Sequence, residues 1–177
     1  MQRAIIIGSP GAGKSTFARK LRDKTDIPLY YLDQIWHKPD RTNISSKEFD
    51  SRLYAILDRK QWIIDGNYLR TLEVRIQACD TIYFLDYPVA VCLEGARSRI
   101  GKSREDMPWT ETEFDAEFKE WILHFPKRQR PQLCSLIEKY RNQKTVHSFR
   151  SRQETDDYLD TETGNAESQK RGPDYVL

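Results

Sequence analysis

A glycine-rich segment near the start of the chain carries the clearest chemical signal. The run IIIGSPGAGKST has the spacing GxxxxGK[ST], between a short apolar run and a helical pattern. Glycines there admit unusual backbone dihedrals, successive N–H groups can surround phosphates, and a helix N-terminus favours anions. An ordinary glycine turn is the alternative, but the position between a strand and a helix favours a phosphate-binding loop (P-loop).

The P-loop residue types assign individual roles. We expect Lys14 to neutralise the β- and γ-phosphates of a nucleoside triphosphate and the Ser15 hydroxyl to coordinate Mg²⁺. ATP with Mg²⁺ is therefore the expected ligand. The residues predicted to bind it are Gly8, Ser9, Pro10, Gly11, Ala12, Gly13, Lys14, Ser15 and Thr16.

Three further apolar runs end in an aspartate. They are LYYLD at Asp33, WIID at Asp65 and IYFLD at Asp86. Each carboxylate is a candidate to hold the hydration shell of Mg²⁺, and each is equally suited to cap the turn or helix that follows. Local sequence alone does not rank the three.

Basic residues gather in two places, which are Arg97, Arg99, Lys102 and Arg104, and then Lys127, Arg128 and Arg130. Many charge runs are simply solvated faces. The planar fork of arginine nevertheless suits phosphate oxygens, and phosphoryl transfer needs several such donors. We include Arg128 among the catalytic candidates.

The elements that must position these residues alternate along the chain. Strands are predicted at residues 4–7, 28–32, 61–64, 81–85 and 144–149, with helices at 14–24, 45–60, 69–78, 88–99, 110–125 and 131–140 and a last helix from 151. Thr110 with Glu113 is expected to cap the helix that Pro126 ends, and its inward stripe is Phe114, Phe118, Trp121, Ile122 and Phe125. This alternation predicts an α/β fold with a parallel sheet covered on both faces and ligands at the carboxyl ends of the strands.

Composition excludes several classes of protein. Lys and Arg total 29 against 27 for Asp and Glu, so the net charge of +2 provides no general field for nucleic acid or an anionic membrane. The three cysteines form no CxxC pair, which argues against a disulfide framework or a zinc site, and His124 and His147 have no metal-binding spacing. No signal peptide or membrane span is expected, and we predict a cytoplasmic protein. Nothing in the sequence predicts an oligomeric state.

With these residues in place, about 3–159 of the chain resembles the DNA topology modulation protein family, a branch of the adenylate-kinase-like P-loop kinases. The matching stretches are IIIGSPGAGKST, YYLDQIWHKPD, WIIDGNYLRT, IYFLDYP, FPKRQRP and SFRSRQE. The resemblance implies a three-layer P-loop NTPase fold with a five-stranded sheet in the order 2-3-1-4-5. It also implies a small lid at about residues 100–112.

The same resemblance implies roles for particular residues. Asp65 ranks first as the residue that organises Mg²⁺, Arg70 would face a phosphate, and Arg99 would be a lid-proximal arginine. The adenine would lie near the turn after the fifth strand, where Arg150 is our candidate. Gly95 stands where a further arginine is expected, so Arg97 is a possible substitute.

We assign Asp33 to the acceptor side, because related small-molecule kinases hold the acceptor hydroxyl at this place and the aromatic segment QIWHKP follows. An alcohol must lose a proton during transfer, and a nearby carboxylate accepts it. Trp36 and His37 suit stacking on an acceptor or covering the core equally well.

The predicted protein is a P-loop kinase that transfers the γ-phosphoryl group of ATP to a small acceptor, either a nucleotide or a small hydroxy compound. One alternative is a regulatory ATP-binding protein or slow ATPase that acts through a protein or DNA partner. The other is a nonspecific DNA-binding protein, although no nucleic-acid-binding signature is present. We expect the kinase-like domain to span residues 1–159 and the polar residues 160–177 to form a disordered tail.

Overall fold

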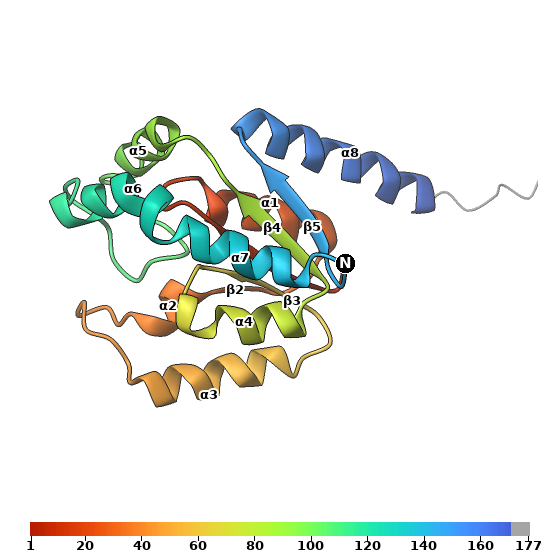
Figure 1. The fold of residues 1–177 in the computed structure, drawn as a ribbon, viewed down its shortest axis with the longest axis horizontal. Coiled ribbons are helices and arrows are strands. Elements are labelled where there is room, and N and C mark those ends of the chain that lie inside the picture. The colour runs from red at the N-terminus through yellow and green to blue at the C-terminus, as the bar shows by residue number, and fades with distance from the viewer. Residues whose placement is uncertain (171–177) are drawn as a thin grey trace, which may run out of the picture.

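A five-stranded parallel sheet organises the molecule (Figure 1). The computed structural model describes residues 1–170, with side chains as far as residue 161. The strands are β1 (Arg3–Gly8), β2 (Leu29–Tyr31), β3 (Trp62–Asp65), β4 (Thr81–Leu85) and β5 (Thr145–Phe149). Their order is β2-β3-β1-β4-β5, which confirms the predicted order. Because all neighbours run parallel, every strand presents its carboxyl end at one edge of the sheet.

Helices cover both faces of this sheet, as the alternating pattern predicted (Figure 1). They are α1 (Lys14–Thr25), α2 (Leu32–Trp36), α3 (Ser46–Leu57), α4 (Leu69–Ala78), α5 (Val89–Arg97), α6 (Ala116–Arg128), α7 (Arg130–Tyr140) and α8 (Arg152–Lys170). The bounds of α4 and β4 match the prediction residue for residue.

Successive side chains of a strand point to opposite faces of the sheet, and this divides the core into two clusters. In β4, Ile82 and Phe84 join the cluster that contains the apolar faces of α3, α4 and α7. Tyr83 and Leu85 join the other cluster, with α1, α5 and α8. Each fully buried apolar side chain of this kind contributes roughly 1.5–3 kcal/mol to folding. Burial on both faces therefore holds the strand ends, and any site at that edge, in a fixed arrangement.

Two of the predicted helix starts are confirmed by their cap hydrogen bonds. The Ser45 Oγ accepts a hydrogen bond from the Glu48 N–H at 3.1 Å, at the start of α3. The Ser151 Oγ accepts one from the Glu154 N–H at 3.2 Å before α8, and the Glu154 carboxylate in turn accepts from the Arg150 N–H at 2.8 Å. These contacts satisfy N–H groups that a helix leaves unpaired at its first turn.

The prediction for α6 was wrong at both ends. Asp115, and not Thr110, caps this helix by accepting a hydrogen bond from the Phe118 N–H. Pro126 does not end it, since α6 continues to Arg128. The predicted inward stripe is also too wide, because only Ile122 and Phe125 are buried while Trp121 is 41% exposed.

Three segments differ from simple strands and loops. Asp33 does not end β2 but lies in the first turn of the short helix α2. Residues 98–115, which include the predicted lid, connect α5 to α6 without a helix or strand. The predicted tail from residue 160 falls within α8 as far as Lys170, and residues 171–177 lie outside the described residues.

Two chain-wide observations complete the fold. Cys79 and Cys92 are buried, Cys134 is half-buried, and all three are free thiols. Among the residues that the structure describes, no helix is long and apolar enough to cross a membrane.

Candidate functional site

The P-loop follows β1 and depends on its glycines. Gly8, Gly11 and Gly13 have φ angles of 144°, 80° and 88°, which L side chains rarely adopt. A Cβ atom at Gly8 would lie 2.2 Å from the Leu85 carbonyl oxygen, and one at Gly11 would lie 2.1 Å from the Cys92 carbonyl oxygen. The loop therefore packs against β4 and α5 through bare backbone.

Close packing also explains why glycine stands at position 95. A Cβ atom at Gly95 in α5 would lie 2.2 Å from the carbonyl oxygen of Gly11. The side chain of an arginine, which the resemblance led us to expect here, would collide with the P-loop backbone. Arg97 does not replace it in the cavity described below, since its guanidinium instead lies over the Phe114 ring at 5.5 Å.

The Lys14 side chain turns back over the P-loop. Its Nζ donates hydrogen bonds to the Gly8 and Ser9 carbonyl oxygens, at 3.3 and 3.0 Å. Burial lowers the pKa of this lysine, while the negative charges of Asp65 and Asp33 act to raise it. The carbonyl contacts thus place a positive charge inside the loop, where phosphate oxygens are expected.

Asp65, the last residue of β3, has a carboxylate without a full set of partners. It is 5% exposed, and its Oδ1 atom is buried without a hydrogen bond. Burial raises the pKa of Asp65 to about 6, against the opposing charge of Lys14, and the nearby Asp33 and Asp106 raise it further. A buried, unpaired carboxylate oxygen close to the Ser15 hydroxyl suits a hard cation such as Mg²⁺.

The protein alone does not complete such a cation site. No group of three His, Cys, Asp or Glu side chains in the described part of the chain is arranged to hold a metal ion. A metal here would rest on Ser15 and Asp65 together with other oxygen donors. Phosphate oxygens of a nucleotide are donors of that kind, since Mg²⁺ is usually bound by one or two carboxylates plus substrate phosphates.

Asp33 lines the same cavity. Its Oδ1 accepts a hydrogen bond from the Tyr68 hydroxyl at 2.8 Å. The Tyr68 ring stacks on Phe49, with 5.1 Å between centroids, and packs edge-on against Trp36. These packed aromatic rings therefore hold the half-buried Asp33 carboxylate in place just after β2.

The turn after β3 joins these two parts of the site. The Asn67 side chain accepts a hydrogen bond from the Gly8 N–H at 3.0 Å and donates one to the Gly8 carbonyl at 2.8 Å. The guanidinium of Arg75 in α4 is fully buried and donates to the carbonyl oxygens of Gly66, Asn67 and Tyr68. Arg75 thus fixes the turn in which Asn67 contacts the P-loop and Tyr68 contacts Asp33.

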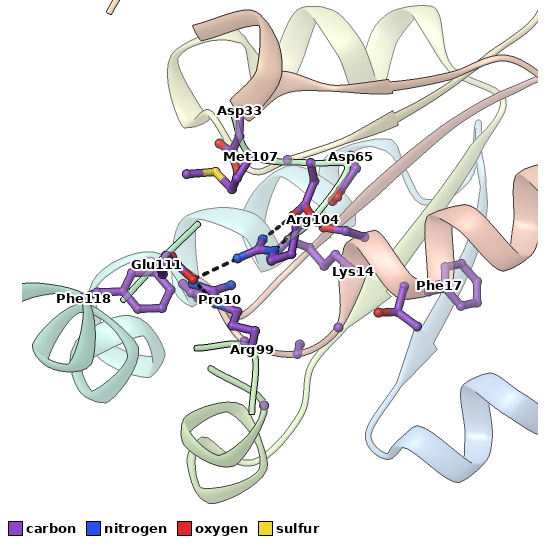
Figure 2. A pocket seen from close by; sticks show the side chains of 18 of the residues that line it. Pro10, Lys14, Phe17, Asp33, Asp65, Arg99, Arg104, Met107, Glu111 and Phe118 are labelled. Atoms are coloured by element: carbon purple, nitrogen blue, oxygen red, sulfur yellow. Dashed lines mark hydrogen bonds and ion pairs between the residues drawn. The ribbon is translucent and has the colours of Figure 1, made fainter. Parts of the chain in front are cut away.

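The 98–115 segment folds over the P-loop through a chain of ionic contacts. Arg99 and Arg104 both bind Glu111, with nitrogen to oxygen distances of 2.8 and 3.1 Å. Arg104 also binds Asp106, whose Oδ2 accepts a hydrogen bond from the Ser15 hydroxyl at 2.7 Å. Figure 2 shows Arg99, Arg104, Lys14, Asp65 and Asp33 gathered around this region.

Further contacts fix the same segment to the body of the protein. The Glu105 carboxylate lies 3.2 Å from Arg22 in α1 and accepts a hydrogen bond from the Tyr31 hydroxyl at 3.1 Å. The Trp109 ring packs edge-on against His37 at 5.1 Å, and the Arg41 guanidinium lies over it at 5.9 Å. The segment therefore reaches both the phosphate side and the Asp33 side.

One large cavity of about 1130 Å³ brings together residues of the P-loop, of β3 and α2, and of the 98–115 segment. The predicted site residues that line it are Pro10, Gly11, Ala12, Gly13, Lys14, Ser15, Thr16, Asp33, Asp65 and Arg99. Ligand pockets for drug-sized molecules span roughly 300–1,000 Å³, so this cavity has room for a nucleotide and a second small molecule.

Other predicted residues lie elsewhere. Asp86 forms a two-pronged ion pair with Arg130, at 2.8 and 2.7 Å, and lines a separate cavity together with Ser9 and Arg150. Arg128 is exposed at the end of α6, outside the residues that line the large cavity. Arg70 pairs with Asp50 on the outside of α3 and also lies outside that lining.

Several site residues were missed by the sequence reasoning. Asp106, Glu111, Asn67, Arg75 and Arg152 meet the cavity or its supporting turn from distant positions in the sequence. Only Asn67 offered a local signal, since it follows the strand-end Asp65–Gly66 pair. The others have ordinary polar contexts, and their contacts depend on the fold.

Comparison with solved structures identifies kinases of the same fold. Shikimate kinase from Acinetobacter baumannii, in complex with shikimate, matches at 15% identity with a TM-score of 0.57, over 97% of each chain. Shikimate kinase from Bacteroides thetaiotaomicron matches at 16% identity and a TM-score of 0.54, over 94% of this chain and 98% of that chain.

An unliganded sugar kinase from Janibacter sp. matches at 12% identity and a TM-score of 0.50, over 95% of this chain and 93% of that chain. No protein-family model and no curated protein matches the sequence. The chain therefore has the P-loop kinase fold along almost its whole length, at sequence identities that show the fold alone.

Proposed function

We propose that this protein is an ATP-dependent phosphotransferase that moves the γ-phosphoryl group of ATP to a hydroxyl group of a small molecule. The observation that carries the proposal is that a P-loop and the half-buried carboxylate of Asp33 face one cavity. A hydrolase needs only the P-loop and a water molecule. A carboxylate held by Tyr68 at some distance from the P-loop suits a second substrate.

The residues of the chain divide the chemistry between them. Lys14 and the P-loop N–H groups bind and orient the phosphates, with Arg99 and Arg104 as further donors to phosphate oxygens. Ser15 and Asp65 would hold Mg²⁺, which when bound supplies positive charge at the β- and γ-phosphates. Asp33 accepts the proton of the acceptor hydroxyl, and the 98–115 segment excludes water from the cavity.

The acceptor belongs to the small hydroxy compounds in this proposal. A nucleotide that accepts on a phosphate is already anionic and needs no base, whereas an alcohol does. The matched shikimate kinase structure contains shikimate, a hydroxylated acid, and the third match is a sugar kinase. The likeness of the fold makes hydroxy acids and sugars the first compounds to test.

Membership of the DNA topology modulation protein family is part of the proposal. It rests on the six sequence stretches named above, which include the P-loop, the Asp33 segment and the Asp65 turn. The alternative function is a regulatory ATP-binding protein or slow ATPase that acts through a protein or DNA partner. The proposed kinase-like domain spans residues 1–159.

A labelled-ATP assay against a panel of metabolites tests the proposal. The panel should hold sugars, hydroxy acids including shikimate, nucleosides and nucleoside monophosphates. We expect label to move to at least one hydroxy compound, and Lys14→Ala to abolish this transfer. Release of inorganic phosphate alone, at a rate that no acceptor changes, would support the ATPase alternative and contradict the kinase proposal.

A further inference from the structure

Asp106 occupies a place that the mechanism above does not explain. This carboxylate belongs to the 98–115 segment, yet it is only 3% exposed and receives the Ser15 hydroxyl hydrogen bond at 2.7 Å. Ser15 and Asp106 are 91 positions apart in the sequence. Burying a carboxylate is unfavourable unless positive charge or hydrogen bonds compensate it. A carboxylate in this position therefore needs an explanation.

The charges around Ser15 define what this place would bind. Two carboxylates lie there, because Asp106 contacts the Ser15 hydroxyl and Asp65 lines the same cavity close to that hydroxyl. The Asp65 Oδ1 atom has no hydrogen-bond partner although it is buried. Adding a hydroxyl oxygen to two carboxylates gives a set of hard oxygen donors, which is the donor set that Mg²⁺ prefers.

Arg104 is in direct contact with Asp106. The guanidinium of Arg104 contacts both Asp106 oxygens and at the same time binds Glu111. The ion pair with Arg104 lies inside the protein, since the side chains of Asp106 and Arg104 are only 4% and 16% exposed. Arg104 thus supplies the charge that a divalent cation would supply to the same carboxylate.

We propose that Asp106 is a third protein ligand of the Mg²⁺ that accompanies ATP, joining Ser15 and Asp65 from the 98–115 segment. The bound cation takes the place of Arg104 beside Asp106. Arg104 is then released toward the phosphates, which need cationic donors during transfer. Metal binding and closure of this segment are thereby coupled. This inference rests on the proposed function, since it assigns a further residue to the same site.

The segment offers a matched control one residue away. Glu105 is also a carboxylate that fixes the segment to the body, but it contacts Arg22 and Tyr31 and not Ser15. Glu105→Gln and Asp106→Asn therefore remove comparable charge from the same segment. Only Asp106→Asn should affect a metal ion at Ser15.

Binding of Mn²⁺, followed by electron paramagnetic resonance with a non-hydrolysable ATP analogue, tests the proposal without relying on turnover. We expect Asp106→Asn to weaken Mn²⁺ binding to the nucleotide complex by roughly 10–100-fold, the usual scale for groups around a metal. Glu105→Gln should change it by less than about 3-fold on the same scale. Unchanged or tighter Mn²⁺ binding in Asp106→Asn would overturn the proposal and show that Asp106 does not bind the metal.

Substitution by a soft ligand separates direct ligation from an effect through Arg104. Asp106→Cys should bind Cd²⁺ in the nucleotide complex at least about 10-fold more tightly than the unaltered protein does, because thiolates select soft metals. Cadmium–thiolate absorption should appear in that variant alone. Weakened Mn²⁺ binding without any gain for Cd²⁺ would overturn direct ligation.

One further measurement separates an error about Asp106 from an error about the proposed function. Calorimetry of the unaltered protein with the ATP analogue and Mn²⁺ measures nucleotide binding, on which the proposed function depends. Absence of binding there contradicts the nucleotide site as a whole, and with it the role of Asp106. Normal binding in the unaltered protein, together with normal Mn²⁺ affinity in Asp106→Asn, contradicts only the inference.

Discussion

Asp33 and Asp65 face the same cavity but differ in what surrounds their carboxylates. Asp33 is half-buried and accepts a hydrogen bond from Tyr68, whereas Asp65 is buried with an unpaired oxygen beside Ser15. Asp86, the third strand-end aspartate, is neutralised by Arg130 outside that cavity. The three residues looked equivalent in the sequence, because what separates them is which partner the fold brings to each.

Asp33→Asn tests the role of a general base. The variant should bind ATP with nearly unchanged affinity and transfer the phosphoryl group roughly 10²-fold more slowly or worse, the scale of a positioned acid–base group. Calorimetry with ATP and the labelled-ATP assay measure the two quantities. Asp86→Asn is the matched control, since it makes the same chemical change at an aspartate outside the cavity. Weakened ATP binding in Asp33→Asn alone would mean that the roles of Asp33 and Asp65 are reversed.

The buried Asp65 predicts a dependence of stability on pH. Its pKa is raised from 3.8 to about 6 in the folded protein, so the folded state binds more protons than the unfolded chain between these values. The free energy of unfolding should therefore fall, relative to that of Asp65→Asn, as the pH rises through this range. Two pKa units correspond to roughly 3 kcal/mol as an upper figure.

Denaturant unfolding of both proteins at pH 4 to 7, without metal or nucleotide, measures this difference. Asp50→Asn provides a control, because the hydrogen bond from Arg70 lowers the pKa of the half-buried Asp50 from its ordinary value of 3.8, so the stability that this carboxylate contributes changes mainly below pH 4 and should be nearly constant across the range. A constant difference between the unaltered protein and Asp65→Asn across the range would show that the Asp65 carboxylate is not disfavoured by burial.

Among the elements, those with one consistent local pattern were predicted well. The helix α4 and the strand β4 were predicted to the residue, and Ser45 and Ser151 cap helices as expected. The prediction for the start of α6 was wrong because two local capping patterns compete there. Thr110 with Glu113 has the spacing of a capping box, but Asp115 has the same spacing to Phe118 and forms the cap.

Pro126 misled the prediction for a physical reason as well. A proline in a helix removes one N–H donor and so usually ends the helix or bends it. Here it lies only two residues before the end of α6, and the Gln129 N–H still donates to the Phe125 carbonyl. The missing N–H group therefore interrupts the hydrogen bonding only near the end of α6, with two helical residues after it.

Helix α4 supports the site through Arg75, which predicts a large effect at a residue outside the cavity. Arg75→Met should lower the free energy of unfolding by about 3 kcal/mol or more, because the buried carbonyl groups of Gly66 and Asn67 lose this donor. The amide of Gly8 should also exchange faster with solvent, since Asn67 holds it. Denaturant unfolding and hydrogen exchange of the Gly8 amide measure both effects.

Arg70→Met is the matched control on the same helix. Arg70 is exposed and pairs with the surface carboxylate of Asp50, so its loss should cost less than about 1 kcal/mol. The Gly8 amide should be unaffected. Equal losses of stability in the two variants, with unchanged exchange at Gly8, would contradict a supporting role for Arg75.

For the molecule as a whole, the 98–115 segment connects the two halves of the cavity. Its contacts reach α1, β2, α2 and the segment around His37. The family resemblance implied a small lid here, but the sequence did not predict its contacts, because Ser15 and Asp106 are 91 positions apart. Each contact is a pair of common residues without a local pattern. The P-loop was predictable because all its chemistry lies in consecutive residues.

Because of this connection, we expect nucleotide binding at the P-loop to slow hydrogen exchange on the acceptor side of the cavity as well. An ATP analogue with Mg²⁺ should slow hydrogen exchange at residues 101–109 and also at residues 36–44, because Trp109 packs between His37 and Arg41. Trp109→Ala should leave protection of the P-loop intact while removing the protection of residues 36–44. Tyr54→Ala, at an aromatic ring that is 53% exposed on α3, serves as the control and should change neither. If residues 36–44 were protected equally in Trp109→Ala, the two halves of the cavity would communicate through the sheet and not through this segment.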